Sequence, residues 1–172
     1  MKIKFEDFLN ESLRDKMKPK DREEVEAIFK KYKEGGAVSV YKDVIGKTIK
    51  SVYVVDDSVE DYKDDEIWFE FEDGKTYKMY HKQDCFESVY IEDINGDMED
   101  LIGEPLLVAE EVTSDDPSAS ESGTWTFYKF ATIKGYVDIR WHGISNGYYS
   151  EYVSFEEYNH PYPYPPKVSN KK

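Results

Sequence analysis

The spacing of apolar residues changes along the chain, from a helical period before residue 36 to a strand period after residue 46. One predicted helix has its apolar face at Phe5, Phe8, Leu9 and Leu13, and a second at Val25, Ile28, Phe29 and Tyr32. Lys18-Pro19 separates them, because the residue before a proline avoids helical dihedrals. Gly35-Gly36 is typical of a helix end. The sequence therefore predicts an N-terminal helical segment over residues 1–36.

From Gly46 onward, apolar and polar residues alternate with the period of two that indicates β-strands. The predicted strands cover residues 48–55, 67–71, 76–81, 88–94, 106–112, 124–133, 136–141 and 149–155. Turn signals lie between them, including Asp73-Gly74 and Asn146-Gly147, and residues 114–123 are expected to form a mobile loop. Short strands joined by tight turns indicate an antiparallel sheet.

We therefore expect an α+β fold, with two short N-terminal helices followed by a strongly twisted, mainly antiparallel β-sheet of about seven strands that curls toward a barrel. The acidic β-rich domain is expected over residues 44–156. Residues 157–172 are expected to form an extended, exposed tail, because the prolines in it lack the backbone donor that a central strand needs.

Charge is distributed unevenly along the chain. Residues 1–33 carry 10 basic and 8 acidic groups, whereas residues 34–159 carry 10 basic and 29 acidic groups, a net charge of −19. A body this acidic is repelled by nucleic-acid phosphates and by anionic membranes, so direct binding to either is not expected. The same charge fits a protein that binds a basic partner, or one whose acidic surface serves solubility alone. The 15 Tyr, 9 Phe and 3 Trp indicate a folded chain, because disordered chains are poor in aromatics.

The single cysteine and the lack of long apolar runs bear on the compartment. Cys85 has no partner for an internal disulfide, which favours a reducing environment. The chain has no run of about 18 apolar residues, and its N-terminus lacks the apolar core of a signal peptide. We expect a soluble, intracellular protein that is a monomer or a small homo-oligomer.

Residues 81–105 are the densest stretch for candidate chemistry, with His81, Cys85 and many carboxylates around one apolar run. Zinc would require more Cys or His ligands, and residues 93–100 have their glycine out of register for an EF-hand calcium loop. Neither a metal nor another cofactor is expected. Because Cys85 has no catalytic motif around it, we interpret it as a buried structural cysteine.

The same stretch alternates as a half-buried strand does. One face is predicted to carry Val89, Ile91 and Asp93, and the other Tyr90, Glu92 and Ile94. Met98, Leu101 and Ile102 then have the spacing of a single helical turn that ends at Gly103. The stretch is therefore interpreted as a strand, an acidic turn and a short helix.

Two segments, QDCFESVYIEDINGDMEDLIGEPLLVAEEVTS and TWTFYKFATIKGYVDIRWHGISNGYYSEYVSF, are similar to an uncharacterised domain found in tailed bacteriophages and some bacteria. The resemblance covers roughly residues 44–156 and is carried by long stretches. In that family a second Cys often follows the first, where this chain has Phe86, and the departure argues against a metal-binding Cys pair. The head FEDFLNESLRDKMKPK is similar to N-termini of unrelated proteins of some tailed phages. The resemblance implies a phage origin, and hence the cytoplasm of the infected bacterium, but no activity.

A candidate ligand site lies around the only arginine of the acidic body. Arg140 neighbours two aromatic rings in the sequence, and an arginine between aromatics can hold a planar or anionic ligand by stacking and bidentate hydrogen bonds. Alternatively, Arg140 offsets nearby carboxylates while the aromatics fill the core. The candidate residues are Arg140, Trp141, His142, Asn146, Tyr148, Tyr149 and His81.

The sequence contains no nucleophile elbow and no phosphate-binding glycine loop, so the protein is not expected to be an enzyme. We expect a phage-encoded acidic binding protein that binds a host protein and counteracts an anti-phage defence. Its candidate contact surface is formed by Asp93, Asp97, Glu99 and Asp100. Three alternatives remain: sequestration of a small anionic or nucleotide-like ligand near Arg140, a structural or assembly role in the virion, and a metal-dependent enzyme.

Overall fold

The computed structural model describes residues 38–55 and 64–159, and these form almost exclusively β-structure. The strands are β1 (Val38–Val40), β2 (Ile49–Val55), β3 (Glu66–Phe71), β4 (Thr76–Tyr80), β5 (Glu87–Asn95), β6 (Val108–Asp115), β7 (Ser122–Ala131), β8 (Tyr136–Ser145) and β9 (Ser154–Glu157). A single 3₁₀ turn, η1 (Met98–Leu101), follows β5. The two predicted helices, and the predicted tail from residue 160 onward, lie outside the described residues.

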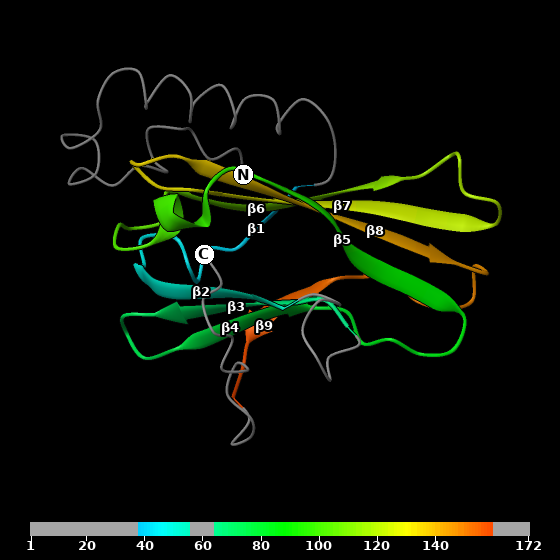
Figure 1. Ribbon diagram of the computed structural model, residues 1–172, viewed down its shortest axis with the longest axis horizontal. Helices are drawn as coiled ribbons and strands as arrows, with labels where there is room; N and C mark the ends of the chain where they lie inside the picture. Colours follow the sequence, from blue (N-terminus) through cyan, green and yellow to red (C-terminus); the bar gives the residue numbers. More distant parts are fainter. Residues whose placement is uncertain (1–37, 56–63, 160–172) are drawn as a thin grey trace.

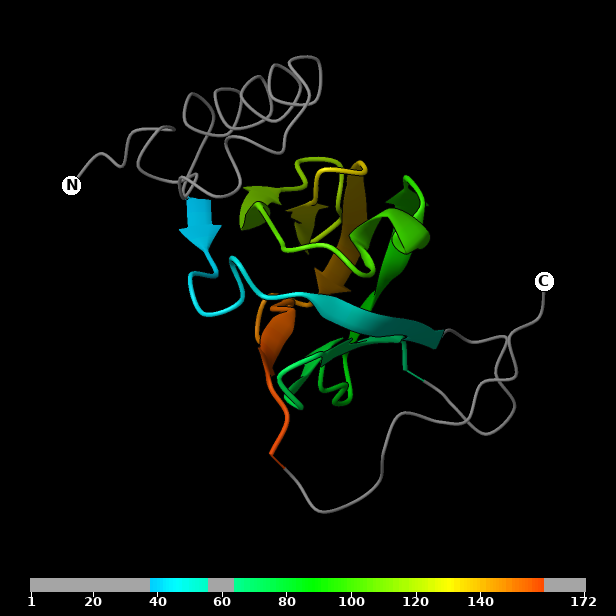
Figure 2. The ribbon, with the colours of Figure 1, turned by 90° about the vertical axis from the view of Figure 1, so that its left-hand side faces the viewer.

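The strands form two antiparallel sheets that lie face to face (Figure 1). One has five strands in the order β1-β6-β7-β8-β5, and the other has four in the order β2-β3-β4-β9. Figure 2, which views the molecule from the end that carries η1, shows the two layers separately. Each sheet thus has one face that is covered by the other sheet and one outer face.

The predicted α+β class and the single sheet curling toward a barrel are wrong for the described residues. These form two stacked sheets without an α-helix, and neither sheet closes on itself. The alternating pattern correctly indicated short antiparallel strands, but each hairpin specifies only its own pairing. Which hairpins join one sheet is decided by the burial of apolar faces against each other.

Aromatic side chains from both sheets fill the space between the layers. The ring of Phe69 in β3 lies 5.3 Å from that of Phe130 in β7 and 5.4 Å from that of Phe155 in β9, measured between centroids. All three belong to one core cluster. Rings at these separations stabilise a core beyond the area that they bury.

A β-bulge in β5 changes which residues face the core. Ile91 pairs with Trp141 of β8, but Asp93 pairs with Arg140, so Glu92 is the additional residue. The predicted strict alternation of residues 88–94 is therefore broken. Ile91 and Ile94 both pack against the core, because a bulge moves the residues after it to the other face.

Several strand boundaries also differ from the prediction, and those at the end of β6, the start of β7, the end of β8 and the start of β9 shape one end of the molecule. β6 continues to Asp115 and β7 begins at Ser122, so the predicted loop 114–123 is a six-residue connection inside a hairpin. The last predicted strand, 149–155, starts only at Ser154. Residues 149–153 instead cross the end of the sandwich before β9 begins.

Candidate functional site

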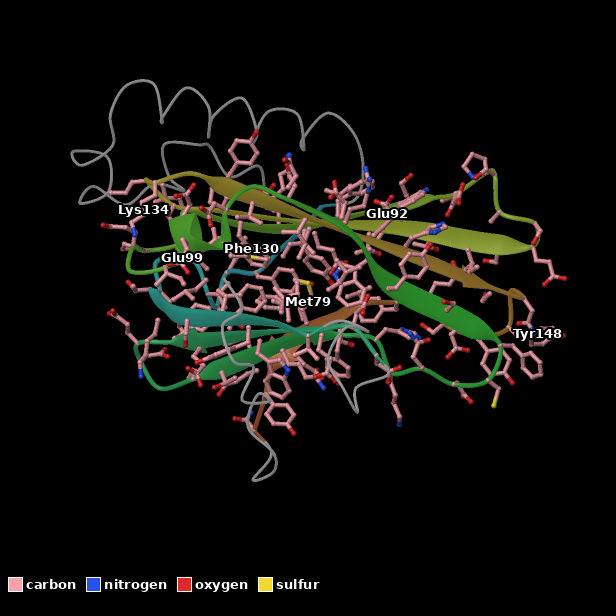
Figure 3. All side chains as sticks on the ribbon, viewed as in Figure 1. Met79, Glu92, Glu99, Phe130, Lys134 and Tyr148 are labelled. Carbon is pink, nitrogen blue, oxygen red and sulfur yellow. The ribbon has the colours of Figure 1, made fainter. Side chains whose placement is uncertain are left out.

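Three connections meet at the end of the sandwich opposite η1: the β4–β5 loop, the β6–β7 loop and the β8–β9 loop. We call this region the loop end. Figure 3 shows Tyr148 at this end, whereas Glu99 and Lys134 lie at the opposite end. The loop end carries two pockets and several exposed apolar side chains, and it is the candidate site.

The loop end exposes apolar side chains that a folded protein normally covers. Tyr148 has 94% of its surface exposed, Phe86 65%, Tyr152 58% and Ile144 41%. The ring of Tyr149 lies 5.6 Å from that of Phe86, which connects the β8–β9 loop to the β4–β5 loop. We refer to these five side chains as the apolar rim. Apolar groups that gather around pockets indicate a binding surface.

The first pocket, which we call the hairpin pocket, has a volume of about 550 Å³. The β6–β7 hairpin forms one wall, and the start of β5 and the end of β8 form the other. The lining residues are Phe86, Glu87, Ser88, Asp116, Ser118, Ala119, Ser120, Glu121, Ser122, His142, Ile144, Ser145 and Asn146. The pocket thus combines three carboxylates, five serines, one imidazole and an apolar edge.

The second pocket, the hydroxyl groove, has a volume of about 660 Å³ and shares Ser122 with the first. It is lined by Thr113, Ser114, Asp115, Ser122, Thr124, Thr126, Tyr149, Ser150, Glu151 and Tyr152. Most of these side chains carry a hydroxyl group, which can both donate and accept hydrogen bonds.

His142 is fixed at the base of the hairpin pocket by three neighbours. Its ring stacks on Trp125 of β7 with 3.9 Å between centroids. Its Nε2 lies 2.9 Å from an Asp116 oxygen, and its Nδ1 lies 3.1 Å from the Tyr90 hydroxyl. Trp125 and Tyr90 are the cross-strand partners of His142 on either side, so the sheet register itself brings these rings together. Both ring nitrogens of His142 are therefore engaged.

Asp116 anchors the β6–β7 hairpin to the sheet. Its carboxylate accepts hydrogen bonds from the backbone N–H and the hydroxyl of Ser118, at 2.9 and 2.6 Å, and contacts His142. The Ser118 hydrogen bonds, with a smaller contribution from His142, hold the pKa of Asp116 below its ordinary value. The charged Asp116 carboxylate therefore stabilises the conformation of the β6–β7 hairpin.

Glu151 belongs to the β8–β9 loop and lies against β8, where Gly143 makes room for it. A Cβ at Gly143 would lie 2.8 Å from the Cβ of Glu151, so only glycine lets the loop cross β8 this closely. Glu151 accepts hydrogen bonds of 2.6 Å from Thr124 and from Ser145. Burial raises the pKa of Glu151, but hydrogen bonds from Ser145, Thr124 and Ser122 outweigh it and leave the pKa lowered.

His81 is buried below the same loops. Its Nδ1 lies 2.7 Å from the Tyr152 carbonyl oxygen, and its Nε2 lies 3.6 Å from a Glu87 oxygen. The side chain of Glu87 is also buried, and it accepts hydrogen bonds from the backbone N–H groups of Asp84 and Phe86. Through these contacts His81 holds the β4–β5 loop against the β8–β9 loop.

The residues predicted to form one ligand site are divided between two faces of β8. Trp141 is fully buried in the core, whereas Arg140 is on the outer face, as the strand period requires. The Nε of Arg140 donates to a Glu92 oxygen at 2.5 Å, and its guanidinium lies 5.6 Å from the Trp125 ring. Neither of the two pockets is lined by Arg140 or Trp141.

The remaining predicted ligand residues do reach the loop end. His142 and Asn146 line the hairpin pocket, Tyr149 lines the hydroxyl groove, and Tyr148 belongs to the apolar rim. Sequence reasoning missed Asp116 and Glu151. The turn-forming composition of Asp116-Pro117-Ser118 was a sequence signal that could have pointed to Asp116. No sequence signal pointed to Glu151, because its contact with Thr124 comes from a strand that is distant in sequence.

The residues of the predicted acidic surface have different local contacts. Asp93 lies on β5, 3.8 Å from the Arg140 guanidinium. Asp97 caps η1 by accepting a 3.0 Å hydrogen bond from the backbone N–H of Glu99. The backbone carbonyl of Asp100 accepts a hydrogen bond from Thr132. Asp97, Glu99 and Asp100 therefore form the acidic turn at the η1 end, where two of them stabilise local structure.

The interpretation of Cys85 as a buried cysteine is wrong, because its side chain is exposed in the β4–β5 loop. The loop turns outward there to bring the backbone N–H groups around it onto Glu87. A hydrogen bond with Asp84 raises the pKa of the Cys85 thiol, which makes it a poor nucleophile at neutral pH.

Within residues 38–55 and 64–159, no group of three or more His, Cys, Asp or Glu side chains is arranged to hold a metal ion. In the same part of the chain, no helix has the length and apolar character needed to cross a membrane.

Comparison with known proteins gives a family but no relative of known function. A family model described as a domain of unknown function, DUF7448, matches residues 42–155. No curated protein and no solved structure matches the chain. The match confirms the expected domain of unknown function at almost the predicted positions, and it covers the chain from before β2 to the first residues of β9.

Proposed function

The chain belongs to the DUF7448 family, whose function is unknown, and we propose from the geometry that it is a non-enzymatic protein that binds another protein through the loop end. The observation that carries the proposal is the apolar rim. Tyr148 and Phe86 are mostly exposed beside two pockets. Aromatic side chains of this kind contribute most of the binding energy in protein interfaces when a partner covers them.

The chemistry of the loop end supports binding rather than catalysis. A serine nucleophile would need a free imidazole nitrogen as its base, but the two nitrogens of His142 face Asp116 and Tyr90. The hydrogen bond with Asp84 raises the pKa of the Cys85 thiol, which disfavours the nucleophilic thiolate. His142 is therefore not positioned as a general base, and Cys85 is not activated as a nucleophile.

Arg140 supports a protein partner over a small anionic ligand. Its guanidinium pairs with Glu92 and lies near Asp93, so its charge is offset within the molecule. An anionic ligand would have to displace these carboxylates. The rest of the body is strongly acidic, which favours encounter with a basic protein surface.

We propose that the partner is a bacterial host protein and that the protein is phage-encoded, acting in the infected cell. The support is the similarity of residues 44–156 to domains found in tailed phages, together with the similarity of the N-terminal segment to phage N-termini. A small acidic protein with an exposed contact surface suits the inhibition of a host defence component.

A capture experiment with matched variants tests the proposal. The full-length tagged chain, the double variant Phe86→Ser/Tyr148→Ser and the control Glu99→Gln at the η1 end are incubated with host lysate. We expect a partner that the wild type and Glu99→Gln retain and that the double variant loses. Equal retention by all three chains would contradict a role for the loop end, provided that circular dichroism shows the double variant to be folded.

A further inference from the structure

We propose that the hairpin pocket accepts an arginine side chain from a basic segment of the partner. This inference rests on the proposed binding function and specifies the chemistry of its partner. The pocket is open to the surface, is bordered by Phe86 and Ile144 of the apolar rim, and has room for one long side chain.

The charged groups that line the hairpin pocket are mainly negative. Glu87, Asp116 and Glu121 contribute carboxylates, and no lysine or arginine is among the described residues that line it. The carboxylates of Glu87 and Asp116 are engaged with backbone N–H groups, Ser118 and the two histidines. Glu121, which is exposed, makes no hydrogen bond or ion pair within the described part of the chain. Glu121 is therefore the carboxylate that remains available to a ligand.

The remaining lining selects a guanidinium over other cations. The exposed Phe86 ring offers a flat face on which a guanidinium can stack, as arginine does more readily than lysine. The fork of a guanidinium can donate to the Glu121 carboxylate and to nearby serine hydroxyls, such as Ser120, at the same time. The methylene groups of the side chain would lie against Ile144. These features together match an arginine side chain. The carboxylates alone would not distinguish the pocket from a solvated acidic surface.

Nuclear magnetic resonance titration of the full chain tests the inference without the partner. The probe is N-acetyl-L-arginine amide, and the controls are N-acetyl-L-citrulline amide, which has the same shape without the charge, and N-acetyl-L-lysine amide. We expect saturable shifts of the amides of residues 116–122 and 142–146 with the arginine probe. Binding of the citrulline probe should be weaker by about tenfold, the effect of losing one charged hydrogen bond.

Two variants locate the binding. Glu121→Gln should weaken binding of the arginine probe by a similar factor of about ten. Glu99→Gln, at the opposite end of the molecule, should leave this binding unchanged. No saturable shift, equal binding of the citrulline or lysine probe, or insensitivity to Glu121→Gln would overturn the inference. Self-association of the chain that Tyr148→Ser abolishes would also overturn it, because a second copy would then occupy the loop end. A partner captured through the apolar rim would still support the binding function in any of these cases.

Discussion

The indole Nε1 of Trp141 lies 3.2 Å from the sulfur of Met79, and this contact connects the two sheets through the centre of the core. Trp141 comes from β8 of one sheet and Met79 from β4 of the other, and both side chains are fully buried. The pair thus places β8, which carries His142 on its outer face, in a fixed position over the second sheet.

Removing the Trp141 ring should destabilise the fold strongly. Trp141→Ala is expected to lower the free energy of unfolding by about 3–5 kcal/mol, because it leaves a large cavity between the sheets. Urea denaturation followed by circular dichroism measures the loss. The control Tyr148→Ala removes an exposed ring and should change stability by about 0.5 kcal/mol or less. Similar losses in both variants would show that Trp141 is not a core residue.

A side chain at Gly143 should displace the β8–β9 loop. In Gly143→Ala the new Cβ would lie 2.8 Å from the Cβ of Glu151, a distance too short for two carbon atoms. Either the loop moves or the protein loses stability, by about 1–3 kcal/mol if it behaves as other overpacked sites do. The thermal melting temperature and the amide shifts of residues 145–152 report the two effects. The neighbouring variant Ile144→Ala, at an exposed position, should leave the melting temperature and the amide shifts of residues 147–152 nearly unchanged.

The lowered pKa of Glu151 predicts the direction of a pH effect. A carboxylate whose pKa is lower in the folded than in the unfolded state contributes stability above about pH 4.3, the ordinary value for Glu, and loses it as the pH falls through the lower folded value. Glu151→Gln should therefore be less stable than the wild type near neutral pH, and the difference should shrink in acid. Urea midpoints at about pH 7 and about pH 3 test this. Glu72→Gln, at an exposed turn, should behave as the wild type does at both.

The two neighbouring acids of η1 should differ in their effect on stability. Asp97→Ala removes the oxygen that caps the turn and should cost about 0.5–2 kcal/mol. Glu99→Ala leaves this hydrogen bond intact, because Glu99 contributes only its backbone N–H, and should change stability by about 0.5 kcal/mol or less. The difference in urea midpoint is the measurement. If the two variants were equally stable, the side chain of Asp97 would have no capping role.

The sequence by itself determined the local structure of the described region. The period-two pattern located most of the strands, and Asp73-Gly74 marked a hairpin that the structure has between β3 and β4. The spacing of Met98 and Leu101 located η1. These features depend on residues that are near one another in the chain, so a short window contains the physical information that forms them.

Only the tertiary structure decided which hairpins share a sheet, because that choice depends on apolar faces that cover one another across the core, as Phe69 and Phe130 do. The bulge at Glu92 likewise arises from pairing with β8 and could not be predicted from alternation. Adjacent positions in a strand point to opposite faces, which separated Trp141 from Arg140 and His142. The loop end also depends on tertiary structure: Phe86, Asp116, Glu121 and Tyr149 come from three connections distant in sequence, and the pairing of β5 and β7 with β8 in one sheet brings them together.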